Sequence, residues 1–344
     1  MTESKTPADD SGDYCCPACR GDVRHGENGY VCPACARTYP ILCGIPDFRL
    51  KPDHYLSLAD ERAKAQHLHD YGKGRSLREM VTEYYRITDD VPPDMAEKFA
   101  SYVLDGERRA AEILSALPAP HGRILDAGCA SAGAVAAVKR AGGEIVGMDI
   151  ALRWLVIGAK RLSEAGLEAR LVCADITAPP FRNGRFDSVI AADLLEHFAE
   201  PWTAAAAVGA MLKPGGGVYF SAANRYTLGP YPLAGLWGVG FLPRTLRRRY
   251  VVMRRGIDTL RHATLLSPAS LARIVKDENF TILTREPLRV APPPAGSALR
   301  GAAIAAYRKM RDTPGVSTLL LHAGPAFEIV ARRDFHTSND GKDQ

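Results

Sequence analysis

Residues 124–134 read ILDAGCASAGA, and this stretch decides the fold. An apolar strand runs into Asp126, continues through Gly128 and passes into small residues that can begin a helix. Glycine lets the backbone approach a ligand closely, and the free N–H groups at a helix N-terminus attract a carboxylate. The stretch therefore predicts a strand, a tight turn and a helix that together bind the anionic end of a ligand.

Strand and helix patterns alternate from Gly122 onward. The strand patterns are RILDAG, EIVGMDI, ARLVCADI, FDSVIAADLLEHF and GGVYFSAAN, and helical stretches end near Ala141, Ala165 and Leu212. This alternation predicts parallel strands with crossover helices, and hence an α/β fold with a Rossmann-like, doubly wound sheet. After Phe280, the patterns TILTREPLRV and AFEIVARRD predict an antiparallel hairpin at the sheet edge.

Two further acidic residues end strands of this sheet. Asp149 closes EIVGMDI about twenty residues after the first strand, a spacing at which an acid accepts hydrogen bonds from ribose hydroxyls. Asp175 lies in CADI, where its carboxylate can pair with an adenine amino group while Ile176 covers the ring. Because ligands of such sheets bind at the carboxyl ends of the strands, we expect all these residues at one site.

Taken in order, these motifs resemble the class I S-adenosylmethionine-dependent methyltransferases over residues 123–280, with FDSVIAADLLEHF and LKPGGGVYF adding to the likeness. The resemblance implies S-adenosylmethionine as cofactor. It also implies a residue set: Asp126, Gly128, Cys129 and Ala130 at the methionine end, Asp149 and Ile150 at the ribose, Asp175 and Ile176 at the adenine, and Ala192, Asp193 and Leu194 on the opposite wall.

The loop departs from the family pattern at two positions. The family loop reads Asp-x-Gly-x-Gly-x-Gly, whereas Ala130 and Ala132 stand here and the next glycine is Gly133. Small residues keep the turn feasible, so we expect weakened or reshaped cofactor binding and not its loss. A dehydrogenase is the rival reading of a strand, a glycine turn and a distal acid. It fits less well, because Gly-x-Gly-x-x-Gly is absent and the LKPGG turn has no role there.

The cysteines indicate a metal site near the N-terminus. The tetrapeptide Cys-Pro-Ala-Cys occurs twice, at residues 16–19 and 32–35, among eight cysteines in the chain. Two such knuckles supply the four thiolates of a closed, structural zinc site, with Cys16, Cys19, Cys32 and Cys35 as ligands. The repeated proline favours Cys16 over Cys15, although a register that uses Cys15 stays open.

Residues 14–48 resemble the zinc-ribbon family related to the activator subunit of tRNA and protein methyltransferases. The likeness includes Tyr39-Pro40 and the sequence GIPDF at 44–48, while Cys43 takes a position that is more often polar. Around this module we predict the following organisation: a disordered tail over 1–13, the ribbon over 14–48, a helical connector of two to four helices over 49–118, the methyltransferase domain over 119–333, and a second tail over 334–344.

An insertion over 225–266 follows the strand that ends at Asn224, and it is too long for a simple connection. It combines aromatic residues with a basic run at 244–255. We predict an acceptor lid over an apolar or anionic molecule; a patch that touches membrane or RNA phosphates and a solvated covering helix are the alternatives. The residues assigned to the lid are Asn224, Tyr226, Tyr231, Trp237 and Phe241.

Two histidines are candidate general bases. His262 lies just before the helix that follows the insertion, and it resembles a histidine that family members place beside the acceptor pocket. His197 follows Glu196 after the fourth strand, and we favour a structural role for it over a catalytic one. Since methyl transfer often needs only proximity and alignment, neither histidine is required to act as a base.

Composition restricts the partners only mildly. The net charge of +5 permits RNA without demanding it, and the sequence lacks a secretory signal and an apolar run of membrane-spanning length, so we expect a cytoplasmic protein. We favour methylation of a small-molecule or lipid-like acceptor, with secondary metabolism as one setting. An rRNA or tRNA methyltransferase and a catalytically silent methyltransferase-fold partner protein are the alternatives. The oligomeric state is not determined by the sequence.

Overall fold

The predicted alternation of strands and helices is present in the structure, a computed structural model that describes residues 12–89, 91–118, 122–292 and 298–335. The predicted tails therefore lie outside the described residues, except for residues 12, 13, 334 and 335. Asp13, assigned to the first tail, forms ion pairs with Arg170 and Arg185.

Within the described residues, seven strands form the large sheet in the order β10-β11-β9-β8-β5-β6-β7. Their bounds are β5 Arg123–Ala127, β6 Glu144–Asp149, β7 Arg170–Cys173, β8 Phe186–Ala192, β9 Leu212–Ala223, β10 Phe280–Pro287 and β11 Ala326–Arg333. β6 pairs with β7 and β8 with β9 in parallel, whereas β11 pairs with both β9 and β10 antiparallel. The predicted Rossmann-like α/β sheet with an antiparallel edge hairpin is confirmed.

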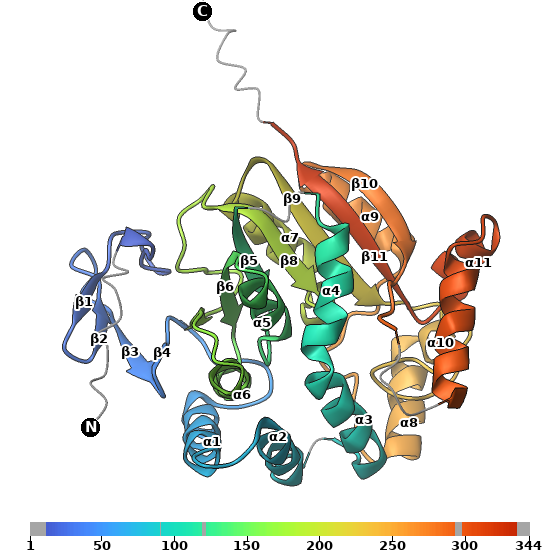
Figure 1. Cartoon of the computed structure of the whole chain (residues 1–344), viewed down its shortest axis with the longest axis horizontal. Coiled ribbons are helices and arrows are strands. Elements are labelled where there is room, and N and C mark those ends of the chain that lie inside the picture. Colours follow the sequence, from blue (N-terminus) through green and yellow to red (C-terminus); the bar gives the residue numbers. More distant parts are fainter. Residues whose placement is uncertain (1–11, 90, 119–121, 293–297, 336–344) are drawn as a thin grey trace, which may run out of the picture. The chain divides into compact units, whose positions relative to one another are not determined.

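The chain forms two compact units, Met1–Ala110 with Leu125–Arg185, and Ala111–Ile124 with Phe186–Gln344. The first unit begins with a small antiparallel sheet, β1-β2-β3-β4, at the predicted ribbon (Figure 1). Its strands are β1 Arg24–Gly26, β2 Gly29–Val31, β3 Thr38–Leu42 and β4 Ile45–Pro46. The helices assigned to it are α1 Leu58–Tyr71, α2 Leu77–Arg86, α3 Pro93–Leu104, α5 Gly133–Arg140 and α6 Leu152–Glu164, and α4 Gly106–Ala116 crosses the boundary.

Of the connector helices, α1 and α2 pack against α6 (Figure 1). A buried ion-pair cluster joins α1 to α6: the Arg153 guanidinium donates to Asp53 at 2.8 Å and also to Glu61, and the Arg153 N–H donates to Glu61 at 2.9 Å. Tyr84 of α2 is buried against Trp154, with ring centroids 4.3 Å apart. Tyr84 thus packs in the interior between α2 and α6.

The second unit contains β8 to β11 and the helices that connect them. These are the short helix η2 Leu195–His197, α7 Pro201–Met211, η3 Val239–Phe241, α8 Arg244–Arg255, α9 Pro268–Asp277, α10 Ala298–Arg311 and α11 Val316–Ala323. α9 begins where it does because Ser267 accepts from the Ser270 N–H and Pro268 occupies the first turn. Among the described residues, no helix has the length and apolar character that crossing a bilayer needs.

Candidate functional site

The four predicted zinc ligands come together in the ribbon. The Sγ atoms of Cys16, Cys19, Cys32 and Cys35 all lie within 4.8 Å of one another. Cys16 and Cys35 are separated by 3.6 Å and Cys19 and Cys32 by 3.5 Å. A tetrahedral zinc with Zn–S bonds of about 2.3 Å places its sulfurs about 3.8 Å apart, so the group fits that ion. Cys15 is not in the group, and its N–H donates to the Pro180 carbonyl at 2.8 Å.

The loop after β5 is a set of consecutive tight turns. The N–H groups of Gly128 and Cys129 both donate to the Met148 carbonyl, at 2.8 and 3.0 Å. Gly128, Ala130 and Ala132 have φ values of +78°, +43° and +57°, in the left-handed region that favours glycine. The two alanines that replace family glycines therefore occupy conformations that glycine would adopt at lower cost.

Asp149 links the ends of β5 and β6. Its Oδ2 accepts from the Ala130 N–H and its Oδ1 from the Ala151 N–H, both at 2.8 Å. The Ala174 N–H, just after β7, donates to the Asp149 carbonyl at 2.9 Å. The Ile150 carbonyl accepts from the Arg49 guanidinium at 3.2 Å and faces the Cys173 thiol at 3.4 Å. The loop and the Asp149–Ile150 turn, both predicted from sequence, are thus in direct contact.

Burial dominates the electrostatics of the two carboxyl groups in this region. Burial raises the pKa of Asp126 to about 7, and the charge of Asp149 adds to that shift. Burial also raises the pKa of Asp149, which the N–H groups of Ala151 and Ala130 oppose. Buried acids with raised pKa values indicate a site where a ligand cation restores the charge balance. The ammonium group of S-adenosylmethionine is such a cation, so the residues present fit this cofactor.

At the third strand end, Asp175 is half-buried and its carboxylate accepts from the Thr177 N–H at 2.8 Å. Ile176 beside it is buried. Of the remaining predicted cofactor residues, Ala192 ends β8 in the second unit, and Asp193 and Leu194 follow it. Asp193 has a φ of +51°, and its carboxylate accepts from the Ser221 hydroxyl at 2.7 Å.

The aromatic residues that we assigned to the lid differ in their exposure. Trp237 and Phe241 are 64% and 56% exposed, and Phe241 lies against Tyr226 with ring centroids 5.6 Å apart. Tyr231 instead is fully buried in a cluster with Leu236, Val251, Leu260 and Leu265. Tyr231 has this position because the insertion folds around its own apolar core, and a core needs a large side chain at its centre.

Asn224 connects the start of the insertion to the end of α11 through hydrogen bonds. Its side-chain amide donates to the carbonyls of Leu321 and His322 at 3.2 and 3.1 Å, and its carbonyl accepts from the Tyr226 N–H at 3.1 Å. Asn224 is fully buried, and these bonds use its hydrogen-bonding capacity to join the insertion to the end of α11. The structure therefore supports an anchoring role for Asn224.

The candidate bases differ in exposure. His197 ends η2 and is exposed, while His262 is half-buried. Sequence reasoning missed their neighbour Glu196, which is only 2% exposed. Among the described atoms, Oε2 of Glu196 has no hydrogen-bond partner, and neither has the Tyr231 hydroxyl. Burial, with a contribution from Asp193, raises the pKa of Glu196 well above its usual range. Nothing in the sequence distinguishes this buried glutamate from an exposed one.

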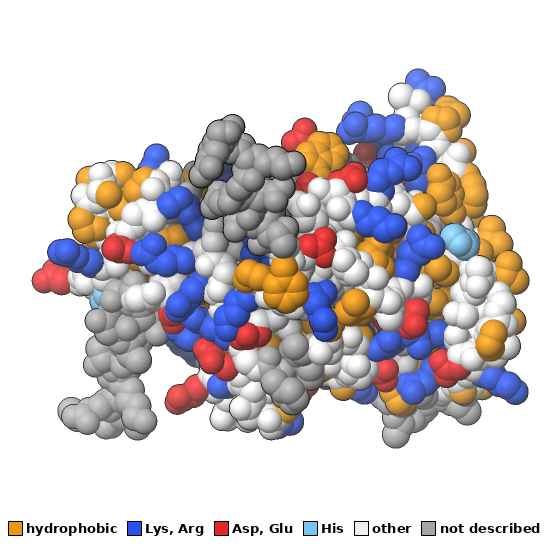
Figure 2. All heavy atoms as spheres, turned by 90° about the horizontal axis from the view of Figure 1, so that it is seen from above, with side chains coloured by type: hydrophobic (Ala, Val, Ile, Leu, Met, Phe, Trp, Pro, Cys, Tyr) orange, Lys and Arg blue, Asp and Glu red, His pale blue; other side chains and the backbone are white. Residues whose placement is uncertain are grey.

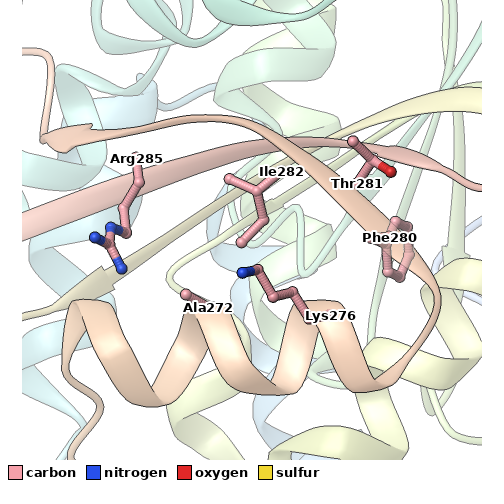
Figure 3. Close-up of a pocket in the computed structure, with 6 residues that line it drawn as sticks. All are labelled: Ala272, Lys276, Phe280, Thr281, Ile282 and Arg285. Atoms are coloured by element: carbon pink, nitrogen blue, oxygen red, sulfur yellow. The ribbon is translucent and has the colours of Figure 1, made fainter.

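A separate hollow lies between α9 and β10, where Lys276 and Arg285 flank Ile282 (Figure 3). Its lining consists of Ala272, Lys276, Phe280, Thr281, Ile282 and Arg285. Because none of these residues belongs to the predicted cofactor or acceptor set, the hollow is not the candidate active site.

Comparison with known proteins agrees with this geometry. Residues 125–220 match the model of a methyltransferase domain family. A ubiquinone biosynthesis O-methyltransferase of Thiobacillus denitrificans is 30% identical over 173 residues, which cover 48% of this chain and 69% of the relative. The enzyme of that name from Methylococcus capsulatus is 28% identical over 221 residues, 60% of this chain and 88% of the relative.

Among solved structures, the [4+2]-cyclase SpnF is similar over 67% of this chain and 82% of its own, with a TM-score of 0.45 and 20% identity. A likeness of that strength carries no argument about activity. Three other findings do support an argument about activity. They are the sequence identity with the O-methyltransferases, the match to the methyltransferase family model, and the acids Asp126, Asp149 and Asp175 at or near the ends of strands. The chain belongs to the class I S-adenosylmethionine-dependent methyltransferases.

Proposed function

We propose that this methyltransferase transfers the methyl group of S-adenosylmethionine to an oxygen atom of a small-molecule or lipid-like acceptor. One observation carries the proposal: the relative that is 30% identical over 69% of its own length is named an O-methyltransferase of ubiquinone biosynthesis. A hydroxylated aromatic ring with an apolar tail is therefore the first acceptor class to test. A role in secondary metabolism and a cytoplasmic location stay hypotheses from the sequence.

Bound S-adenosylmethionine supplies an electrophilic methyl group on its sulfonium. We assign Asp126 to its ammonium group and the N–H groups of the 128–132 loop to its carboxylate, which the raised pKa of Asp126 and the tight turns support. Asp149 and Ile150 are assigned to the ribose, and Asp175 and Ile176 to the adenine. We also assign Ala192, Asp193 and Leu194 to the cofactor, as the sequence resemblance implies.

An oxygen acceptor loses one proton as its bond to the methyl carbon forms. His262 is our first candidate to take this proton and His197 the second, since an imidazole titrates near neutral pH. Glu196 joins them as a candidate, because its Oε2 is buried without a partner among the described atoms and a polar ligand could satisfy it. Alignment of acceptor and cofactor provides the rest of the rate enhancement.

The insertion supports an acceptor with apolar surface. Tyr226, Trp237 and Phe241 leave apolar surface exposed that a ligand can cover. An RNA acceptor remains the alternative because of the basic helix α8. On the face drawn in Figure 2, however, the Lys and Arg side chains lie in separate groups among Asp and Glu side chains. That face therefore does not present the continuous basic surface that favours binding to a phosphate backbone.

We further propose a structural zinc ion on Cys16, Cys19, Cys32 and Cys35. Four thiolates close the coordination shell, so this ion stabilises the ribbon and has no open position for substrate. A module of this size has too small a core to fold well without such a constraint.

Product formation tests the proposed function directly. The full chain would be incubated with radiolabelled S-adenosylmethionine and either hydroxylated aromatic compounds with prenyl tails or total RNA. We expect label to move into the organic-soluble aromatic product, and Asp149→Ala to prevent this. Labelling of RNA alone would favour the RNA alternative, and a chain that does not bind the cofactor would be the silent partner protein.

A further inference from the structure

A buried arginine of α6 contacts Ser131, which lies between the two left-handed alanines of the loop over residues 128–132, called the cofactor loop below. The Nε–H of Arg161 donates to the Ser131 carbonyl at 2.7 Å, between Ala130 and Ala132 in the chain. A terminal nitrogen of the same guanidinium lies 3.3 Å from the Ser131 hydroxyl. Arg161 is only 6% exposed, so these contacts are made away from bulk water.

The same guanidinium also holds the C-terminal end of α3. It donates to the Val103 carbonyl at 2.6 Å and to the Leu104 carbonyl at 3.4 Å. The last carbonyls of a helix lack partners within the helix, and a cation there is favourable. Arg161 therefore connects the connector helix α3 to the cofactor loop through one planar group.

Close backbone packing accompanies this connection. A Cβ atom added at Gly133 would lie 2.7 Å from the carbonyl carbon of Gly106, so the turn after α3 rests directly on the loop. On the other side, a Cβ atom added at Gly158 would lie 2.9 Å from the methyl group of Ala132. Gly158 stands one helical turn before Arg161 and leaves space for the alanine that replaces a glycine.

A left-handed conformation is less favourable for an alanine than its preferred regions, because its Cβ atom crowds the following carbonyl oxygen. Two such residues on either side of Ser131 would relax if nothing held the loop, because extended and right-handed conformations are cheaper for them. The surrounding contacts must therefore impose the turn. The donor that reaches the middle of this segment from outside the loop is Arg161.

We propose that Arg161 is a positioning residue of the cofactor site, which fixes Ser131 and so keeps Ala130 and Ala132 in the turn that binds the methionine end of the cofactor. The proposal rests on the proposed function, because it takes the loop to be that binding surface. It explains how a loop that lacks two family glycines holds two alanines in left-handed conformations: the constraint comes from α6 and the connector turn.

The experiment measures the affinity of the full chain for S-adenosylhomocysteine by titration calorimetry. Arg161→Met keeps most of the side-chain stem but removes all donors, and we expect about tenfold or greater loss of affinity. The matched control is Arg140→Met on α5. Arg140 also reaches the connector, but it is exposed, and its ion pair is with Glu107, outside the loop. We expect the affinity of Arg140→Met for S-adenosylhomocysteine to stay within about twofold of the wild-type value.

A double-mutant comparison tests the link to the alanines. In the background Ala130→Gly plus Ala132→Gly, the left-handed turn no longer needs an external constraint, so Arg161→Met should cost only about threefold in affinity. An equal loss in both backgrounds would show that Arg161 does not act through the alanines and would overturn the proposal. Unchanged affinity in Arg161→Met would overturn it as well.

If Arg161→Met does not fold, Arg161→Lys provides the second test. An ammonium group reaches Ser131 or Val103 but lacks the fork that binds both, so an intermediate loss is expected, again reduced in the glycine background. A wild-type chain that binds S-adenosylhomocysteine but methylates no oxygen acceptor contradicts the proposed function and leaves this inference intact. Wild-type affinity in a folded Arg161→Lys and Arg161→Met pair contradicts the inference alone.

Discussion

The backbone N–H of Ala130 donates to Oδ2 of Asp149 at 2.8 Å, so the acid that ends β6 supports the loop after β5. We propose the same carboxylate as the acceptor for the ribose hydroxyls of the cofactor. We therefore assign two roles to this carboxylate, support of the loop and binding of the ribose. It satisfies the N–H groups of Ala130 and Ala151, and it retains lone pairs for ligand hydroxyls.

Asp149→Ala should weaken S-adenosylhomocysteine binding by about 1–3 kcal/mol, because hydroxyls and backbone N–H groups lose their acceptor. Calorimetry measures this effect. Asp187→Ala is a suitable control, since Asp187 also accepts from a backbone N–H, that of Arg123, and lies outside the loop. Equal affinities of the Asp149 variant and the wild type would refute the ribose assignment.

The stability of the ligand-free chain should depend on pH through Asp126. Its pKa is about 7 in the folded state, chiefly through burial, and about 3.9 in an unfolded chain. Between these values the folded state binds a proton that the unfolded state has lost, so the free energy of unfolding falls as pH rises. The contribution levels off above about pH 7.

Urea unfolding of the wild type and Asp126→Asn between pH 5 and pH 8 isolates this group, since all other acids are shared. The wild type should lose up to about 1.4 kcal/mol per pH unit relative to the variant below pH 7. Parallel curves for the two proteins would mean that Asp126 is not held in its neutral form.

Elemental analysis should find close to one zinc ion per chain. Cys16→Ser should lose most of it, because Cys16 belongs to the four-thiol group, whereas Cys15→Ser should retain it. The two variants differ by one position in the chain and are therefore well matched. Zinc loss in the Cys15 variant alone would assign the site to the other register.

Substitution of the exposed aromatic residues of the insertion should weaken acceptor binding without lowering the stability of the chain. Trp237→Ala and Phe241→Ala remove side chains that are more than half exposed, so thermal unfolding should change little while the KM for the acceptor rises. Tyr231→Ala should instead destabilise the chain by about 3–5 kcal/mol, as loss of a buried aromatic ring does. Normal acceptor kinetics in both surface variants would place the acceptor elsewhere.

His262→Ala should lower turnover more than it lowers cofactor affinity, if the half-buried imidazole accepts the acceptor proton. His197→Ala, with an exposed imidazole, should have the smaller effect. The kcat of each variant is compared with its affinity for S-adenosylhomocysteine. A fall in kcat for Glu196→Gln and none for either histidine would assign the proton to Glu196.

Local sequence patterns predicted the order of strands and helices and the residues at the strand ends. They did so because an apolar run that ends in Asp126 or Asp149 is a local pattern, and parallel strands bring such ends to one edge. The Cys-Pro-Ala-Cys repeats likewise predicted the group of four thiols, since two residues between cysteines fix how their sulfurs converge.

Only the tertiary structure decided what surrounds these residues. Glu196 is buried, and Tyr231 lies inside a small core. Arg161 contacts Ser131 and Val103. Each of these environments brings together residues that are far apart in the chain. No local pattern marks them, because burial and hydrogen-bond partners depend on how the elements pack. The left-handed alanines show both levels: the sequence revealed the missing glycines, and packing from α6 and the connector determined how their turn is maintained.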